Sequence, residues 1–213
     1  MTERNFPIGG PVLEVKNISL SFGGVKAITD TSFDILEHEI RAIIGPNGAG
    51  KTTLLKLMYG LFEPTSGHII RNYANTSRLS MIFQNPVFLN RSVYSNLEHA
   101  LFCINVDKNE RNSIITDLFK KYSLEYLSNK DIRLLSGGEL QLVSLLRSLV
   151  IKPNIIFYDE PTNNLDHYNT GLIKEMIKCM VNEKKQIILV SHDDKFVSEL
   201  DCNNIYLEEG RIE

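Results

Sequence analysis

Cysteine is scarce in this chain of 213 residues, and the three that occur, Cys103, Cys179 and Cys202, lie far apart and form no CxxC pair. An odd number of separated cysteines argues against both a disulfide framework and a cysteine-ligated metal site. The pattern is typical of a reducing compartment, where cysteines pack as small buried apolar residues.

Long apolar runs and strong net charge are also missing. No apolar stretch reaches the roughly 18–20 residues that a transmembrane helix needs, and the N-terminal MTERNFPIGGP has no apolar signal-peptide core. A net charge of −3 gives no bulk reason to expect a nucleic-acid partner. The 43% hydrophobic and 23% charged content instead favours a globular domain, with or without an inserted subdomain.

Short apolar segments alternate with helical periods along most of the chain, without an internal repeat or a long linker. Strand–helix–strand alternation with continuous apolar strands predicts an α/β fold whose parallel sheet is covered on both faces. The helical segments in the middle of the chain are interpreted as an insertion into this α/β fold. Strands are expected at 12–22, 31–36, 39–45, 68–71, 78–83, 154–161 and 186–192, and helical segments at 48–62, between 84 and 150, and at 170–184.

A glycine-rich loop follows the apolar segment RAII. The stretch GPNGAGKT has the spacing G-x-x-x-x-G-K-[ST] and opens a helical period. Glycines let backbone N–H groups turn toward phosphate oxygens, Lys51 can reach the β- and γ-phosphates, and the Thr52 hydroxyl can ligate Mg²⁺. This predicts ATP and Mg²⁺ as ligands. The residues expected to contact the nucleotide here are Gly45, Pro46, Asn47, Gly48, Ala49, Gly50, Lys51, Thr52 and Thr53.

Two acidic residues end the apolar strand IIFYDEP. At the carboxyl end of a strand, Asp159 and Glu160 can both face the crevice where ligands bind in open α/β sheets. Asp159 can hold Mg²⁺ through water, and Glu160 is placed to orient or deprotonate an attacking water. Two acids after a strand also fit a solvated loop, but the phosphate loop favours the catalytic interpretation.

A serine and two adjacent glycines open the helical pattern after residue 135, in the stretch LSGGELQ. Because glycine costs about 1 kcal/mol inside a helix, the pair indicates a turn or a helix N-terminus. Exposed N–H groups at such an end favour an anion. The stretch therefore predicts a second phosphate contact, without a lysine of its own.

Together these motifs resemble the nucleotide-binding subunit of an ATP-binding cassette (ABC) transporter. The resemblance runs in order through Phe22, GPNGAGKTT, Gln84 in FQNP, LSGGE, IIFYDEP, NNLD and His192 in VSHD. LSGGE separates this family from kinases, GTPases and helicases. The family implies a P-loop NTPase (RecA-like) core with a parallel sheet, an antiparallel β subdomain and an inserted helical subdomain. Residues 1–213 then form one ABC ATPase domain, with 1–84 and 151–213 as the nucleotide-binding core and 85–150 as the helical signature subdomain.

The resemblance also implies a pair of such subunits, packed head to tail with two ATP molecules between them. The signature of one subunit covers the γ-phosphate of the ATP held by the other. Ser136, Gly137 and Gly138 would therefore serve the partner's nucleotide. Asp166 resembles the aspartate that contacts the opposite subunit.

Three further positions take their expected roles from the family. Gln84 resembles the glutamine that senses Mg²⁺ and the attacking water, so it joins Thr52 and Asp159 in the expected metal set. His192 resembles the histidine that contacts the γ-phosphate. Phe22 lies where the family has an aromatic ring stacked on adenine, although a phenylalanine in a strand is also common in a core.

Two departures from the family pattern stand out. After LSGGE the family often continues with two glutamines and a basic residue, whereas this chain has Leu140, Gln141 and Leu142. Tyr158 precedes the acids where an aliphatic residue is more usual. Neither departure removes a catalytic group, so we expect an active ATPase.

The resemblance favours an importer subunit of bacterial or archaeal type at the cytoplasmic face of the inner membrane. Its expected partners are a second ABC subunit, identical or paired, transmembrane permease subunits and, indirectly, a solute-binding protein. Residues 21–33 and 37–51 resemble branched-chain amino-acid importers, whereas residues 81–97 resemble tungstate or molybdate importers. Because the two halves disagree, the sequence does not decide the substrate, nor whether the chain is natural or recombined.

Two further expectations concern partners. EPTNNLD and SHDDKFV also resemble ABC proteins that act on ribosomes, but those carry two cassettes and a basic linker in one chain. The segment 86–127 is expected to dock a permease, with Val87, Phe88 and Leu89 as its apolar contact. The alternative is that these three residues pack inside the subdomain.

Overall fold

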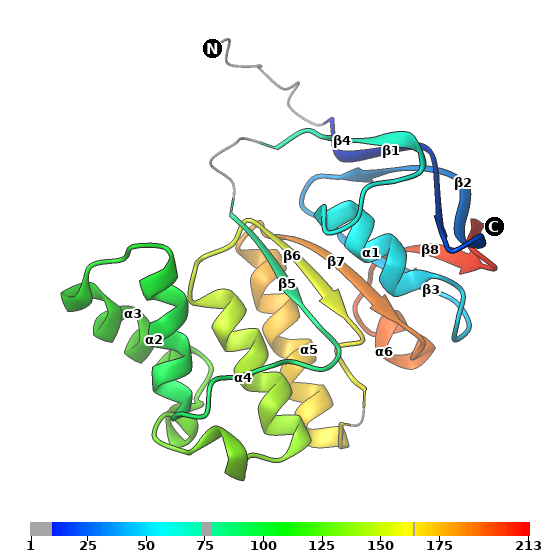
Figure 1. The fold of residues 1–213 in the computed structure, drawn as a ribbon. Coiled ribbons are helices and arrows are strands. Elements are labelled where there is room, and N and C mark those ends of the chain that lie inside the picture. Colours follow the sequence, from blue (N-terminus) through cyan, green and yellow to red (C-terminus); the bar gives the residue numbers. More distant parts are fainter. Residues whose placement is uncertain (1–9, 74–77, 164) are drawn as a thin grey trace.

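The chain forms two sheets and a group of helices in a computed structural model that describes residues 10–73, 78–163 and 165–213 (Figure 1). Residues 1–9 of the N-terminal stretch considered above, and Asn164 of NNLD, lie outside the described residues. The strands are β1 (Pro11–Phe22), β2 (Val25–Leu36), β3 (Ile40–Ile44), β4 (Ser66–Arg71), β5 (Leu79–Ile82), β6 (Ile155–Asp159), β7 (Gln186–Ser191), β8 (Asn203–Glu208) and β9 (Arg211–Ile212). The α-helices are α1 (Lys51–Tyr59), α2 (Val93–Cys103), α3 (Lys108–Lys121), α4 (Gly137–Leu149), α5 (His167–Asn182) and α6 (Asp194–Ser198), with 3₁₀ turns at Glu125–Leu127 and Ile132–Leu134.

The larger sheet has the strand order β5-β6-β7-β3-β8-β9 and is parallel except for β9 at its edge. The smaller sheet, β2-β1-β4, is antiparallel. The predicted α/β fold with a parallel core sheet, an antiparallel β part and a helical insertion is therefore confirmed. No helix in the described ranges has both the length and the apolarity to cross a membrane.

The central strands are buried on both faces, which explains their continuous apolar sequences. Along β6, Ile156 and Tyr158 belong to the core formed with α4 and α5, whereas Ile155 and Phe157 belong to the core around α1. Successive strand residues point to opposite faces, so each strand contributes to both cores. Figure 1 shows α1 between the two sheets and α4 and α5 along the other face of the larger sheet.

The alternation predicted for the first strand is present but interrupted. Leu13, Val15, Ile18 and Leu20 are buried, so the inward positions shift between the second and third of these residues. The pairing register with β2 shifts at the same place, where Asn17 has φ of 48°. A bulge of this kind inserts one residue and restores the apolar side chains to the buried face.

Some elements of the structure start earlier than predicted, and others were not predicted at all. The strand β2 starts at Val25 rather than at residue 31 because it pairs with β1 directly after a two-glycine turn. The helix α5 starts three residues before the predicted position because Asp166 caps it, accepting a hydrogen bond from the backbone N–H of Asn169. The elements α6, β8 and β9 were not predicted.

Candidate functional site

The glycine-rich loop connects the end of β3 to the start of α1, as its sequence context predicts. Gly45, Gly48 and Gly50 all have positive φ, and the loop lines a cleft of about 290 Å³. This cleft is lined by Asn47, Gly48, Gly50, Lys51, Thr52, Thr53, Gln84 and Glu160. The loop thus presents backbone and side-chain donors to a space suited to phosphate groups.

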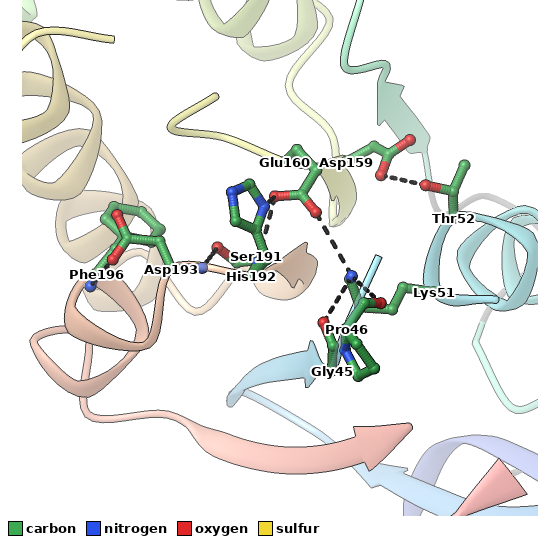
Figure 2. A network of polar contacts seen from close by, with 10 residues as sticks. All are labelled: Gly45, Pro46, Lys51, Thr52, Asp159, Glu160, Ser191, His192, Asp193 and Phe196. Carbon is green, nitrogen blue, oxygen red and sulfur yellow. Dashed lines mark hydrogen bonds and ion pairs between the residues drawn. The ribbon is translucent and has the colours of Figure 1, made fainter. Parts of the chain in front are cut away.

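Lys51 is folded back over its own loop (Figure 2). Its ammonium donates hydrogen bonds to the carbonyls of Gly45 at 2.8 Å and Pro46 at 3.0 Å. The same nitrogen lies 3.9 Å from Glu160 Oε1, and both side chains are less than a tenth exposed. The ammonium therefore has two carbonyl acceptors and a carboxylate nearby, in the place where phosphate oxygens of a nucleotide would bind it.

Thr52 and Asp159 meet at the start of α1 and the end of β6. The Thr52 hydroxyl donates a hydrogen bond of 2.8 Å to Asp159 Oδ1, and this carboxylate is only 3% exposed. Burial raises the pKa of Asp159, the hydrogen bond from Thr52 opposes this rise, and the nearby Glu160 charge adds to it. A hydroxyl and a carboxylate in contact fit Mg²⁺, a hard cation that takes few protein ligands besides substrate phosphates. Within the described residues no three His, Cys, Asp or Glu side chains cluster as a metal cage.

Glu160 turns back toward the phosphate loop directly after the strand ends. Its φ of 48° is unusual for a residue with a side chain, and its N–H donates to the Val190 carbonyl of β7. Its carboxylate is held on both sides, because Oε2 lies 2.8 Å from His192 Nδ1 while Oε1 faces Lys51 (Figure 2). The carboxyl ends of β6 and β7 thus bring the predicted acid and the predicted histidine together.

Gln84 lies just beyond β5 and lines both the phosphate cleft and a neighbouring cleft of about 450 Å³ that also contacts Thr52 and Asp159. Its backbone carbonyl accepts a hydrogen bond of 2.8 Å from Gln141 Nε2 on α4. This contact, which the sequence did not predict, connects the signature helix to Gln84 despite the departure after LSGGE.

The signature forms the N-terminus of α4, as predicted. Ser136 caps the helix in a capping box with Glu139, in which each side chain bonds the other's backbone N–H. Nothing in the described structure lies within 4 Å of a side chain built at Gly137. None of Ser136, Gly137 and Gly138 lines the phosphate cleft described above. The structure therefore does not bring the signature to the phosphate loop of the same chain.

Asp166 and the signature are connected through a residue that sequence reasoning missed. Asn169 donates its side-chain amide to both oxygens of Asp166, at 3.1 and 3.0 Å. A Cβ on Gly138 would lie 2.4 Å from the Asn169 amide nitrogen, so the second signature glycine packs against this group. The sequence spacing of three residues from Asp166 to Asn169, typical of a helix N-cap and its partner, could have predicted this contact.

Phe22 lies at the end of β1 with 48% of its surface exposed. Its ring meets Phe62 edge to face, with ring centres 5.4 Å apart. Of the two interpretations that the sequence left open, partial exposure favours a stacking surface over a core position.

The parallel sheet, the loop before α1 and the acids after β6 define a P-loop nucleotide hydrolase. The pattern of the family described as "ABC transporter" matches residues 28–163. The chain belongs to the ABC transporter family and is an ATP-binding ATPase of that family.

Individual relatives agree with this placement. The tungstate uptake system ATP-binding protein TupC of Peptoclostridium acidaminophilum is 36% identical, over 94% of this chain and 96% of its own length. The sulfate/thiosulfate import ATP-binding protein CysA of Escherichia coli K12 is 31% identical over 94% of this chain, which spans only 59% of that relative. Among solved structures, the dimeric ATP-binding cassette MJ0796 bound to ADP and Pi superposes with a TM-score of 0.81 at 26% identity, covering 94% of this chain and 96% of its own.

Proposed function

We propose that this ATPase energises import of a small oxyanion of the tungstate type through separate membrane subunits. The similarity to TupC over almost the whole of both chains carries this proposal. CysA, whose name also specifies import of oxyanions, supports the same substrate class. In this proposal the chain lies at the cytoplasmic face of the membrane, and a solute-binding protein delivers the oxyanion to the permease.

The proposed chemistry assigns each residue around the phosphate cleft a step. Lys51 leaves the carbonyls of its own loop and binds the β- and γ-phosphates of ATP. Glu160 takes a proton from the attacking water, while His192 holds the γ-phosphate and the acid in one arrangement. Mg²⁺, when bound, would neutralise phosphate charge, and Thr52, Asp159 and Gln84 would hold it or its waters.

We further propose that two chains form each complete ATP site. The observation in favour is that the signature lies outside the phosphate cleft while Gly137 faces open space. The N-terminus of a helix carries a partial positive charge, which suits the γ-phosphate of a nucleotide bound to a partner. Asp166, which packs through Asn169 against the signature, would contact the partner from the same face.

The permease is proposed to dock beside Gln84, on a surface that we define as Phe83, Val87 and Leu89. These side chains are 42%, 82% and 39% exposed, and exposed apolar clusters often mark interfaces. Phe88, which the sequence analysis included, is half-buried instead: the Arg147 guanidinium lies 4.4 Å from its ring centre. The expected apolar contact therefore shifts to the neighbours of Phe88.

Deletion and complementation in the native host test the transport proposal. Cells that lack this chain should lose tungstate uptake, measured by elemental analysis, and regain it with the unaltered chain but not with Lys51→Ala. Normal tungstate uptake with a defect in branched-chain amino-acid uptake would contradict the oxyanion proposal. Co-purification with ribosomes in place of membrane subunits would contradict an importer altogether.

A further inference from the structure

The C-terminal hairpin of β8 and β9 lies directly against the phosphate loop. The strand β8 pairs with β3, the strand that leads into the loop. The hairpin turn at Glu209 and Gly210 has φ of 46° and 76°. At this turn the Gly210 N–H donates a hydrogen bond of 3.0 Å to the carbonyl of Ala49, which immediately precedes the last glycine of the loop.

The same turn is fixed from the opposite side by β2. The Gly210 carbonyl accepts a hydrogen bond of 2.8 Å from the Thr29 N–H and shares the single proton of the Thr31 hydroxyl, at 3.3 Å, with the Thr29 carbonyl, at 3.2 Å. Thr31 is 1% exposed, so this contact is shielded from water. The two sides of Gly210 thus connect the antiparallel sheet to the phosphate loop.

Packing around this contact leaves no space for a side chain. A Cβ on Gly210 would lie 2.6 Å from the Ala27 carbonyl oxygen, and a Cβ on Gly50 would lie equally close to that oxygen. At the other end of the loop, a Cβ on Gly45 would lie 2.0 Å from the Leu207 carbonyl oxygen of β8. The hairpin and β2 together therefore enclose the loop at its first and last glycines.

The hydrogen bond to Ala49 has a direct geometric consequence. In a planar trans peptide the C=O and the N–H of one unit point in opposite directions. Fixing the Ala49 carbonyl toward Gly210 therefore directs the Gly50 N–H away from the hairpin. Phosphate binding by such loops depends on inward-facing N–H groups.

We propose that Gly210 is a positioning residue for ATP binding, which holds the last peptide of the phosphate loop in its binding orientation. The inference rests on the proposed phosphate role of residues 45–53. A hairpin turn that only ended the sheet would need no bond to this loop. Gly210 touches no substrate atom, so its effect should appear in the affinity for ATP and leave the chemical step unchanged.

The deciding experiment compares two glycine substitutions at the same backbone φ. Gly210→Ala and Gly67→Ala both place a side chain at φ of 76°, and both bring a Cβ within 2.6 Å of a backbone carbonyl oxygen. Gly67 lies in β4, which β1 separates from β2, and the described atoms nearest to a Cβ built there belong to Lys16 and Asn17 of β1. Gly210→Ala should raise the Kd for ATP about tenfold, equivalent to about 1.4 kcal/mol, with kcat at saturating ATP changed less than about twofold on the same scale. Gly67→Ala should lower the thermal midpoint at least as much, because its Cβ would lie 2.3 Å from the Asn17 carbonyl oxygen, and it should leave the Kd unchanged.

Equal Kd values for the two variants would overturn the inference. If Gly210→Ala does not fold, Thr31→Val decides, because it removes one buried bond to the Gly210 carbonyl and keeps the side-chain shape. It should raise the Kd roughly two- to tenfold, as expected for one hydrogen bond, and an unchanged Kd would overturn the inference. Lys51→Ala distinguishes failure of the proposed phosphate role of the loop from failure of the Gly210 inference alone. Unaltered ATP affinity in Lys51→Ala would refute the phosphate role of the loop, and with it the inference about Gly210.

Discussion

Glu160 Oε2 lies 2.8 Å from His192 Nδ1, and the two residues come from the ends of adjacent parallel strands. The acid and the histidine are therefore held by the sheet itself, with Lys51 on the other side of the carboxylate. In the proposed mechanism, a γ-phosphate that binds His192 would change the surroundings of Glu160 as well, because the two side chains are in contact.

The role of Glu160 as the catalytic carboxylate predicts a specific defect. Glu160→Gln keeps the shape of the side chain but cannot accept the proton, so turnover should fall roughly 10²–10⁴-fold. ATP should still bind, and an ATP-bound dimer should persist long enough to be detected by gel filtration. Near-normal turnover in a folded variant would exclude the assignment.

The action of Ser136 on a partner's nucleotide predicts complementation between inactive variants. Lys51→Ala removes the ammonium at the phosphate loop, and Ser136→Arg blocks the signature. Either homodimer has two damaged sites, whereas a mixed dimer has one intact site. Mixing should restore at least ATP-dependent dimerisation, measured by gel filtration or light scattering.

Each variant alone serves as the control for this mixture, with circular dichroism to show that it is folded. The ATPase rate per chain of the unaltered protein should also rise with protein concentration, because dimerisation follows mass action. A mixture that stays monomeric with ATP, although both variants are folded, would contradict the shared site.

The raised pKa of Asp159 predicts a gain of stability when its charge is removed. Burial raises this pKa above 3.8, so near neutral pH the folded state carries the cost of a buried charge. Asp159→Asn can still accept the Thr52 hydrogen bond and should raise the thermal midpoint at neutral pH without nucleotide or Mg²⁺. The gain should shrink as the pH falls through the raised pKa toward 3.8, because the native carboxylate then takes up a proton.

The same variant should lose most of its Mg²⁺-dependent turnover, measured against a titration of Mg²⁺. Thermal midpoints near pH 7.5 and pH 4.5 provide the comparison. A variant that is less stable than the unaltered chain near neutral pH would show that the Thr52 contact outweighs the burial of the charge.

Tyr158 predicts a stabilising substitution next to the two acids at the end of β6. Its side chain is fully buried, and its hydroxyl has no hydrogen-bond partner among the described residues. Leaving a buried polar group without a partner costs about 1–3 kcal/mol, so Tyr158→Phe should raise the free energy of unfolding by up to this amount. Denaturant unfolding with an unchanged m-value would measure it, and a loss of stability would indicate a partner for the hydroxyl.

The proposed docking surface predicts different results at two adjacent positions. Val87→Asp should reduce transport in proteoliposomes that contain the permease and leave the ATPase activity of the isolated subunit unchanged. Phe88→Asp should instead lower the thermal midpoint, because it removes the ring that packs beneath Arg147 and against the helical core. Coupled transport at the normal rate by Val87→Asp would exclude this residue from the interface.

Much of the fold and of the site could be predicted because local sequence carries them. The glycine spacing before Lys51, and the acids after a buried strand, depend on neighbours in the chain. The bulge at Asn17 and the contact between Gln141 and Gln84 depend on pairing between distant segments. The sequence left the exposure of Phe88 open, because the residue type alone does not reveal whether an arginine from another helix covers it.

The hydrogen bonds from Lys51 to the carbonyls of Gly45 and Pro46 have a consequence for molecular selection. An anion that binds Lys51 must replace these two carbonyl acceptors. The carbonyls belong to the same chain, so they lose no translational freedom when they bind the ammonium, whereas the incoming anion does. A ligand that offers a single weak acceptor gains little from the exchange, whereas a chain of phosphates offers several at once. We therefore expect an anion with many charged oxygens, such as a triphosphate, to replace both contacts more readily than an anion with few.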